Sequence, residues 1–511
     1  MIGPMVIYGP KNEEYDTDVG PIMFGDFYHS YYIPIEQGIL DQPVKVPFSD
    51  NNLINGKGTF ACNETTLPCT ENAPLPSFNF TSGKTHRLRL INPSSFAVQK
   101  ITIDGMKIRI IANDFVEVEP YETDVVTLAV GQRSDVLVYA DGEPTDSVWL
   151  RGWKSPACSP SHGHDEVKAA IYYENADRSK QPISEPGPNA YNNYCGNDRL
   201  DITVPYYPLG FERNPPVTEI LPIELKSNGT SNLWYMANLT FRVNYNEPVL
   251  RQAETGNLDF DYLENVHNYG NNSSIRFVVQ NTGFQPHPMH LHGHNIQILA
   301  EGSCTDNNTV FPDGTPIPPG VIQGGDAVPN GRNPFGNVTG PPGANGPSAE
   351  AGGPPSGTPT SKRQTYDETG DDTSPKQDTC NDSHSADCVP ASASNATMPN
   401  TNTTSSSTMQ IYGTCWDGHI TNPSNPQRRD VQMLLPGSYI VVQWKQDNPG
   451  VWPFHCHIAW HLSAGFVWTV LEDPQGIREK HSPIPSVVEE TCGAWGEYVK
   501  GNQVQQVGDG L

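Results

Sequence analysis

The stretch His455-Cys456-His457-Ile458-Ala459-Trp460-His461 places a cysteine between two histidines, with a third histidine four residues further on. A thiolate combined with imidazoles is the ligand set of copper electron-transfer centres. Side chains alternate between the two faces of a strand, so His455 and His457 would point one way and Cys456 the other. The stretch therefore predicts one short strand that serves two metal sites on opposite faces.

A second histidine-rich stretch, His287-Pro288-Met289-His290-Leu291-His292-Gly293-His294, supplies what the first stretch lacks. A blue-copper centre needs two imidazoles and one thiolate, with a weak or absent axial ligand. Cys456 and His461 give two of these groups. A histidine from a neighbouring strand must give the third, and His287, set off by Pro288, can reach that site.

The remaining histidines form two His-x-His pairs. His290 and His292 would share one face of a strand, as His455 and His457 do, so the pairs can converge on a common metal cluster. A single histidine-rich run is as often surface decoration as a ligand set. Two such runs, with a cysteine inside one of them, favour the metal cluster.

With these residues in place, the sequence resembles motifs three and four of the multicopper oxidases, and in particular the ascomycete laccases. The resemblance implies that type 1 copper is bound by His287, Cys456 and His461, type 2 copper by His290, and the type 3 pair by His292, His455 and His457. Phe466, ten residues after Cys456, falls at the family's axial position. A phenyl ring cannot coordinate, and the loss of an axial donor favours Cu(I) and raises the reduction potential. The resemblance gives His294 no ligand role, so we expect it to be structural.

The resemblance extends over most of the chain outside residues 305–410. Residues 447–452 lead into the cysteine stretch as they do in laccases, and residues 129–136 are similar to a turn and strand of the second laccase domain. Residues 1–10 look like the last strand of the first laccase domain. The resemblance implies an all-β fold of tandem cupredoxin-like domains, each a Greek-key sandwich or barrel.

Two further laccase motifs, His-Trp-His-Gly and His-Ser-His, do not occur in this sequence. In the family they lie in the first domain and complete the type 2 and type 3 sites. The resemblance therefore implies a complete type 1 site, half-liganded type 2 and type 3 sites, and a chain that lacks most of the first cupredoxin domain. The other His-x-His, His162-Gly163-His164, lies in a Ser/Pro-flanked loop, where we do not expect a copper ligand.

The cysteine count fits the same interpretation. There are ten cysteines, and with Cys456 as a ligand an odd number remains, which cannot all pair. Laccases bridge a C-terminal cysteine to the first domain, and here Cys492 is left over. The expected bridges are Cys62–Cys69, Cys158–Cys195, Cys304–Cys415 and Cys380–Cys388.

Composition indicates a secreted protein. The net charge is −26 and the pI is about 4.8, so nucleic acid and anionic membranes are excluded as partners. Abundant cysteines indicate an oxidising compartment, and eleven Asn-x-Ser/Thr sequons agree with secretion. The sequence shows no signal peptide and no apolar run of the roughly 20 residues that a transmembrane helix needs. We expect a monomer.

Short apolar segments bounded by Gly, Asn, Asp and Pro predict β-strands. They lie at residues 88–91, 101–104, 108–110, 135–139, 275–279 and 439–444. Spacing and resemblance together predict a remnant of a first domain at 1–19, a cupredoxin-like domain without a copper cluster at 20–178, a linker at 179–215, a copper-binding domain at 216–475 and a C-terminal tail at 476–511. Residues 305–410, dominated by Gly, Pro, Ser, Thr, Asn and Asp, predict a disordered insertion in the last domain.

Three functions compete. The resemblance implies a laccase-like oxidase that takes one electron at a time from a phenolic reductant near His461, passes it through Cys456 to His455 and His457, and reduces O2 to water. Such an enzyme would serve pigment or other secondary metabolism, or lignin-type phenol oxidation. A ferroxidase would instead need acidic residues around the type 1 histidines. The third reading is a copper-binding relic without oxidase activity.

Overall fold

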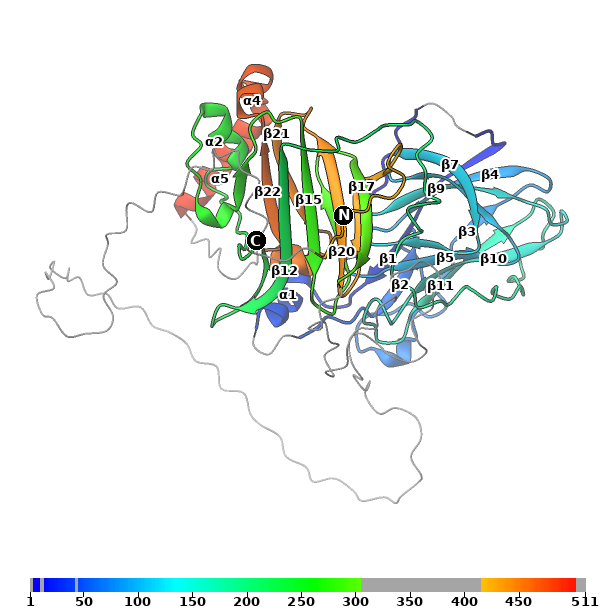
Figure 1. The fold of residues 1–511 in the computed structure, drawn as a ribbon. Helices are drawn as coiled ribbons and strands as arrows, with labels where there is room; N and C mark the ends of the chain where they lie inside the picture. The colour runs from blue at the N-terminus through cyan, green and yellow to red at the C-terminus, as the bar shows by residue number, and fades with distance from the viewer. Residues whose placement is uncertain (1–2, 10–12, 42–44, 305–414, 502–511) are drawn as a thin grey trace, which may run out of the picture. The chain divides into compact units, whose positions relative to one another are not determined.

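The computed structural model describes residues 3–9, 13–41, 45–304 and 415–501. Within these ranges the strands form two β-sandwiches, the first between residues 17 and 172 and the second between residues 217 and 472 (Figure 1). The expected insertion at 305–410, the Cys380–Cys388 pair and the last ten residues lie outside the described ranges.

The first sandwich pairs a six-stranded sheet, in the order β2-β1-β4-β9-β6-β7, with a five-stranded sheet, in the order β3-β11-β10-β5-β8. Alternation builds its core: in β4, His86, Leu88 and Leu90 are buried, while Arg87 and Ile91 are half-buried. The strands are β1 (Thr17–Phe27), β2 (Asn51–Ile54), β3 (Ser77–Asn79), β4 (Thr85–Ile91), β5 (Gln99–Ile103), β6 (Ile108–Asn113), β7 (Val116–Thr123), β8 (Val126–Leu128), β9 (Arg133–Tyr139), β10 (Ser147–Lys154) and β11 (Glu166–Tyr172).

The second sandwich repeats this topology, with sheets in the orders β13-β12-β15-β20-β17-β18 and β14-β22-β21-β16-β19. In the six-stranded sheet of each sandwich, a parallel pair (β1 with β4, β12 with β15) lies next to an antiparallel pair (β4 with β9, β15 with β20). The strands are β12 (Val217–Ser227), β13 (Asn232–Met236), β14 (Val266–Asn268), β15 (Ser274–Asn281), β16 (His287–Leu291), β17 (Ile296–Ser303), β18 (Gln427–Arg429), β19 (Val431–Leu434), β20 (Ser438–Lys445), β21 (Gly450–Cys456) and β22 (Val467–Glu472).

Within the ranges that the structure describes, five α-helices accompany the strands. They are α1 (Tyr32–Leu40), α2 (Val249–Thr255), α3 (Ala459–Ser463), α4 (Pro474–His481) and α5 (Ser486–Gly501), with single 3-10 turns at Cys62–Glu64 and Tyr262–Glu264. Helix α1 contacts α3 and β13, while α2 and α4 contact each other and β21 (Figure 1). In the described part of the chain, no helix is long and apolar enough to span a membrane.

The predicted all-β fold of tandem cupredoxin-like sandwiches is confirmed, and each of the six strands predicted from short apolar segments overlaps an observed one. Two segments differ from expectation. Residues 3–9 form no strand and are mostly exposed, because no described strand pairs with them. The expected tail at 476–511 contains most of α4 and all of α5; α4 begins with Pro474 after Asp473, whose side chain accepts the N–H of Gly476.

Three predicted disulfides are present: Cys62–Cys69, Cys158–Cys195 and Cys304–Cys415. Among the described residues, Cys456 and Cys492 are free thiols, as expected.

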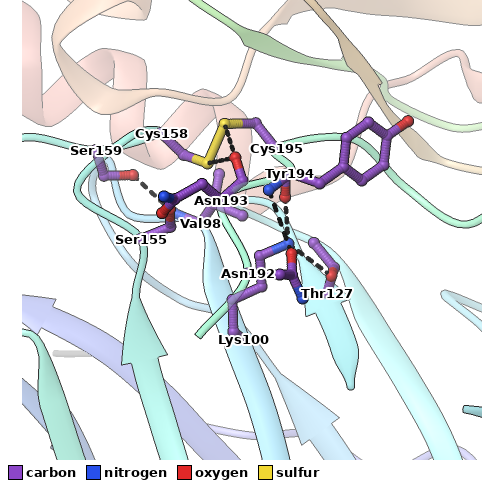
Figure 2. The surroundings of a disulfide bond; sticks show 10 residues. All are labelled: Val98, Lys100, Thr127, Ser155, Cys158, Ser159, Asn192, Asn193, Tyr194 and Cys195. Atoms are coloured by element: carbon purple, nitrogen blue, oxygen red, sulfur yellow. Dashed lines mark hydrogen bonds between the residues drawn. A yellow bond between two sulfur atoms is a disulfide. The ribbon is translucent and has the colours of Figure 1, made fainter. Parts of the chain in front are cut away.

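Figure 2 shows the Cys158–Cys195 bridge beside the buried amine of Lys100. That amine donates to Thr127 Oγ1 at 3.0 Å and to the carbonyl of Tyr194. Burial lowers the pKa of Lys100 to about 7. The bridge and the lysine together tie the segment after the first sandwich back onto it.

Candidate metal centre

The two histidine stretches meet because β16 and β21 are neighbours in one sheet. Their register places Met289 opposite Cys456 and His290 opposite His455. Alternation then puts Cys456 on one face of the sheet and the His290–His455 pair on the other. The candidate ligands of β21 therefore lie on both faces of the sheet, as strand alternation predicts.

On the first face, His287, Cys456 and His461 converge. The Nδ1 atoms of His287 and His461 lie 3.2 Å apart, and Cys456 Sγ lies 3.6 and 3.5 Å from them. Fractional exposure is 0% for His287 and Cys456 and 5% for His461. β16 and β21 supply the first two residues, whereas His461 comes from the short helix α3, which the sequence did not predict.

The electrostatics of this site suit a metal better than a proton. Burial lowers the pKa of His461 to about 3 and that of His287 well below its usual value, so both imidazoles are neutral. Burial raises the pKa of the Cys456 thiol, so metal binding must displace its proton. The centre of the triangle of donor atoms lies about 2 Å from each of them, which matches metal–imidazole bond lengths. Two imidazoles with one thiolate in an apolar pocket fit copper.

Aromatic rings line this first site. The Trp234 ring centroid lies 4.7 Å from those of both His287 and His461, and Trp234 stacks on Phe466 at 5.2 Å. Phe466 is fully buried, with its centroid 5.1 Å from that of His287. Phe96, from the first sandwich, meets His461 edge-on at 6.1 Å. Sequence reasoning missed Trp234 and Phe96 because no spacing links them to the ligands.

On the opposite face, His290, His292 and His455 form a second group whose ligand atoms all lie within 4.8 Å of one another. Nε2 of His292 lies 3.0 Å from Nε2 of His455. The fourth expected ligand, His457, lies just beyond the end of β21, with ring centroids 5.6 Å from His290 and 5.7 Å from His455. The structure therefore gathers all four predicted histidines, with His457 beside the tight group of three.

Hydrogen bonds to the backbone orient two of these rings. His290 Nδ1 lies 2.7 Å from the carbonyl of Asp430, and His455 Nδ1 lies 2.9 Å from that of Cys456. An imidazole that donates through Nδ1 keeps the lone pair of Nε2 for a metal. Burial lowers the pKa of His290 to about 4. The second group is thus also a set of neutral imidazoles.

The first sandwich also reaches this second group, through the turn before β9. Gly131 has φ +84°, and an added Cβ there would lie 2.6 Å from the ring of His457. Arg133 forms an ion pair with Asp430. No local pattern predicts these contacts, because the turn lies about 300 residues from its partners in the sequence.

Other candidate residues have structural surroundings. His294 Nε2 lies 3.1 Å from Glu472, and its Nδ1 lies 3.1 Å from the carbonyl of His292. His164 pairs with Glu64 at 2.9 Å. His162 packs against Phe48 rather than against a second ligand.

Two family models match the chain, and both are described as multicopper oxidase. One matches residues 18–174, and the other matches residues 230–319 and 382–476, so together they cover more than half of the sequence. Curated relatives include an oxidoreductase of Pestalotiopsis microspora (26% identical, covering 97% of this chain and 68% of that protein) and a laccase of Neurospora crassa (26%, 98% and 64%). This chain thus spans about two thirds of their length.

Solved structures share the fold. The laccase from Botrytis aclada superposes with a TM-score of 0.70 at 22% identity, covering 99% of this chain and 73% of that one. Fet3p, a multicopper oxidase that functions in iron import, gives 0.64 at 18% identity, with 98% and 74% covered.

These matches do not confirm the prediction that most of a first domain is missing, since the first family model lies on the first sandwich. Both sandwiches match models of one description, and the relatives align along nearly the whole sequence. This chain belongs to the multicopper oxidase family.

Proposed function

We propose that this chain is a laccase-like oxidoreductase that removes single electrons from phenolic reductants and delivers them to O2. One observation carries the proposal: the buried His287–Cys456–His461 triad shares strand β21 with the second group of histidines. Electron donor and acceptor sites on opposite faces of one strand are separated by only the backbone between Cys456 and its flanking histidines.

The residues divide into roles. His287, Cys456 and His461 would hold type 1 copper, His290 type 2 copper, and His292, His455 and His457 the type 3 pair. Bound copper would supply the one-electron chemistry at the first site and the reduction of O2 at the second. The protein holds the imidazoles neutral and excludes water from Cys456. Phe466, buried beside His287, would face the copper without coordinating it.

The proposed cofactor complement is a full ligand set for type 1 copper and four imidazoles for the second cluster. The relic reading rests on this count, because a cluster with only half of the family's histidines would bind copper without reducing O2. Copper stoichiometry and O2 consumption of the same sample separate the two readings.

A ferroxidase is the alternative within the family. An Fe(II) site beside the first cluster would need carboxylates there, since carboxylate oxygens suit hard cations. The rings packed around His461 are those of Phe96, Trp234, Phe466 and His287. Burial lowers the pKa of His461, and no carboxylate of the described residues contributes to that shift. These aromatic surroundings favour an organic aromatic reductant.

The test compares O2 uptake by the copper-loaded chain with a diphenol and with Fe(II), using Cys456→Ser as the inactive control. We expect turnover with the diphenol that exceeds that with Fe(II) and is lost in the variant. Faster turnover with Fe(II) would favour the ferroxidase. Full copper loading without O2 uptake would favour the relic.

We further propose that the protein is secreted and acts as a monomer. The three disulfides, the sequons and the net charge of −26 support an extracellular setting. Its partners would be a small phenolic molecule and O2.

A further inference from the structure

The carboxylate of Asp26, near the end of β1, collects three consecutive backbone N–H groups from the loop between β4 and β5. Ser95 N donates to one oxygen at 2.8 Å, and Phe96 N and Ala97 N donate to the other at 2.9 Å each. The backbone N–H of Asp26 in turn donates to Ser94 Oγ at 3.1 Å. Hydrogen bonds to an ionised acceptor are about twice as strong as neutral ones, so this carboxylate fixes the loop conformation.

The loop between β4 and β5 makes two contacts with α3, the helix that carries His461. The carbonyl of Ser95 accepts the N–H of Ala459, the first residue of α3, at 3.0 Å. The ring of Phe96, only 4% exposed, meets the ring of His461 edge-on. A helix of five residues has few internal hydrogen bonds, so its position depends on such outside contacts.

Two tyrosines from the segment that follows β1 also pack on α3: Tyr28, and Tyr32 at the start of α1. Tyr28 packs edge-on against Trp460 at 5.4 Å, and Tyr32 stacks on the same ring at 5.3 Å. The Tyr32 hydroxyl also bonds to Ser463. Helix α3 is therefore contacted by residues from the N-terminal half of the chain, whereas His287 and Cys456 come from strands of the second sandwich.

We propose that Asp26 is a positioning residue for the type 1 copper site, acting through Ser95 and Phe96 on His461. The inference rests on the proposed function, because it assigns Asp26 to the metal site named there. Asp26 would keep His461 at the distance from His287 and Cys456 that one metal ion requires. It would also keep the Phe96 ring over His461, which limits the access of water and favours the reduced metal.

A purely structural role makes a different prediction. A residue that only stabilises the fold lowers the stability of the metal-free and copper-loaded proteins equally, and copper affinity then stays the same. A positioning residue weakens copper binding itself. Copper affinity, measured by competition with a chelator, and the redox equilibrium of the site therefore distinguish the two roles without any activity assay.

The experiment uses Asp26→Asn and Phe96→Leu in the full chain. The asparagine is isosteric but has one acceptor oxygen, and its NH2 group faces backbone donors. Asp18→Asn is the control, since Asp18 lies on the same strand eight residues earlier, where it accepts the N–H of Gly20 and pairs with Arg89. We expect Asp26→Asn to lose on the order of tenfold in copper affinity and to shift the redox equilibrium toward Cu(II), with Asp18→Asn unchanged.

A double variant tests whether Asp26 acts on His461 through Phe96. If Asp26 acts through Phe96, Asp26→Asn/Phe96→Leu loses no more affinity than the worse single variant. Additive losses would overturn that route. Copper affinity and redox equilibrium of Asp26→Asn equal to those of Asp18→Asn would overturn the proposal. If Asp26→Asn does not fold, Phe96→Leu takes its place. A copper affinity and redox equilibrium of Phe96→Leu equal to those of the unaltered chain would then overturn the proposal. Absence of the thiolate–copper absorption in the unaltered chain would refute the proposed function rather than this inference.

Discussion

The guanidinium of Arg133 in the first sandwich donates two hydrogen bonds, of 2.7 and 2.8 Å, to the carboxylate of Asp430 in the second. The carbonyl of the same Asp430 lies 2.7 Å from Nδ1 of His290. One residue thus belongs both to the contact between the sandwiches and to the orientation of a metal ligand. Stability and metal binding should respond together when this pair is broken.

Arg133→Ala should lower the free energy of unfolding by about 3–5 kcal/mol, because it leaves a buried carboxylate without its cation. The side chain of Asp430 is 9% exposed. Arg109→Ala is the control, since Arg109 pairs with Glu13 at the surface and should cost less than about 1 kcal/mol. Urea unfolding measures the change in the free energy of unfolding for both variants. Equal costs for the two variants would show that the Arg133–Asp430 pair adds no stability.

Gly131→Ala should disturb the second histidine group and leave the first intact. The new Cβ would lie 2.6 Å from the ring of His457, and φ of +84° is unfavourable for alanine. Gly105→Ala carries similar backbone strain (φ +75°) with no atom within 4 Å. We expect Gly131→Ala to bind less copper per chain while its type 1 absorption persists. Copper content equal to that of Gly105→Ala would contradict the contact with His457.

Glu36 in α1 should make stability depend on pH. Burial raises its pKa from 4.5 to about 7, an effect that the Tyr32 hydroxyl partly offsets. Between these values the folded protein holds a proton that the unfolded chain has lost, so stability falls as pH rises from about 4.5 to about 7. Glu36→Gln removes this penalty.

Glu36→Gln should therefore match the unaltered protein at pH 4 and exceed it by about 3 kcal/mol at pH 8. Chemical denaturation at both pH values measures the difference, with the exposed Glu71→Gln as the control. A gain that is the same at both pH values would mean that the amide improves packing and that the charge of Glu36 is irrelevant.

Phe466→Met should lower the reduction potential of the first site. Phe466 is fully buried beside His287 and cannot donate to a metal. A thioether there can act as a weak axial ligand that favours Cu(II). Redox titration of the copper-loaded protein measures the potential, and Phe80→Met, in the core of the first sandwich, controls for the packing change. An unchanged or higher potential in Phe466→Met would show that residue 466 is not axial.

The grouping of the candidate ligands was predictable because local spacing determines which face of a strand each side chain occupies. Alternation along a strand places Cys456 and His455 on opposite faces whatever the rest of the fold does, and the neighbouring strands bring His290 to His455. The sequence could not place His461 on a helix, because α3 has five residues and no capping side chain.

The rest of the site comes from contacts between residues far apart in the sequence. Phe96, Gly131 and Arg133 lie in loops of the first sandwich, where sequence patterns predict turns but not their partners. Their roles follow only from the packing of one sandwich on the other. The candidate metal ligands could be identified from the sequence, whereas the residues that contact them from the other sandwich could not.

The visible absorption of the copper-loaded chain, measured beside that of Cys456→Ser, tests the central claim most directly. A thiolate held with two imidazoles around copper should give an intense band in the red, and the serine variant should lose that band while retaining its fold. A colourless unaltered chain, or the same band in both proteins, would contradict the assignment of His287, Cys456 and His461 to type 1 copper.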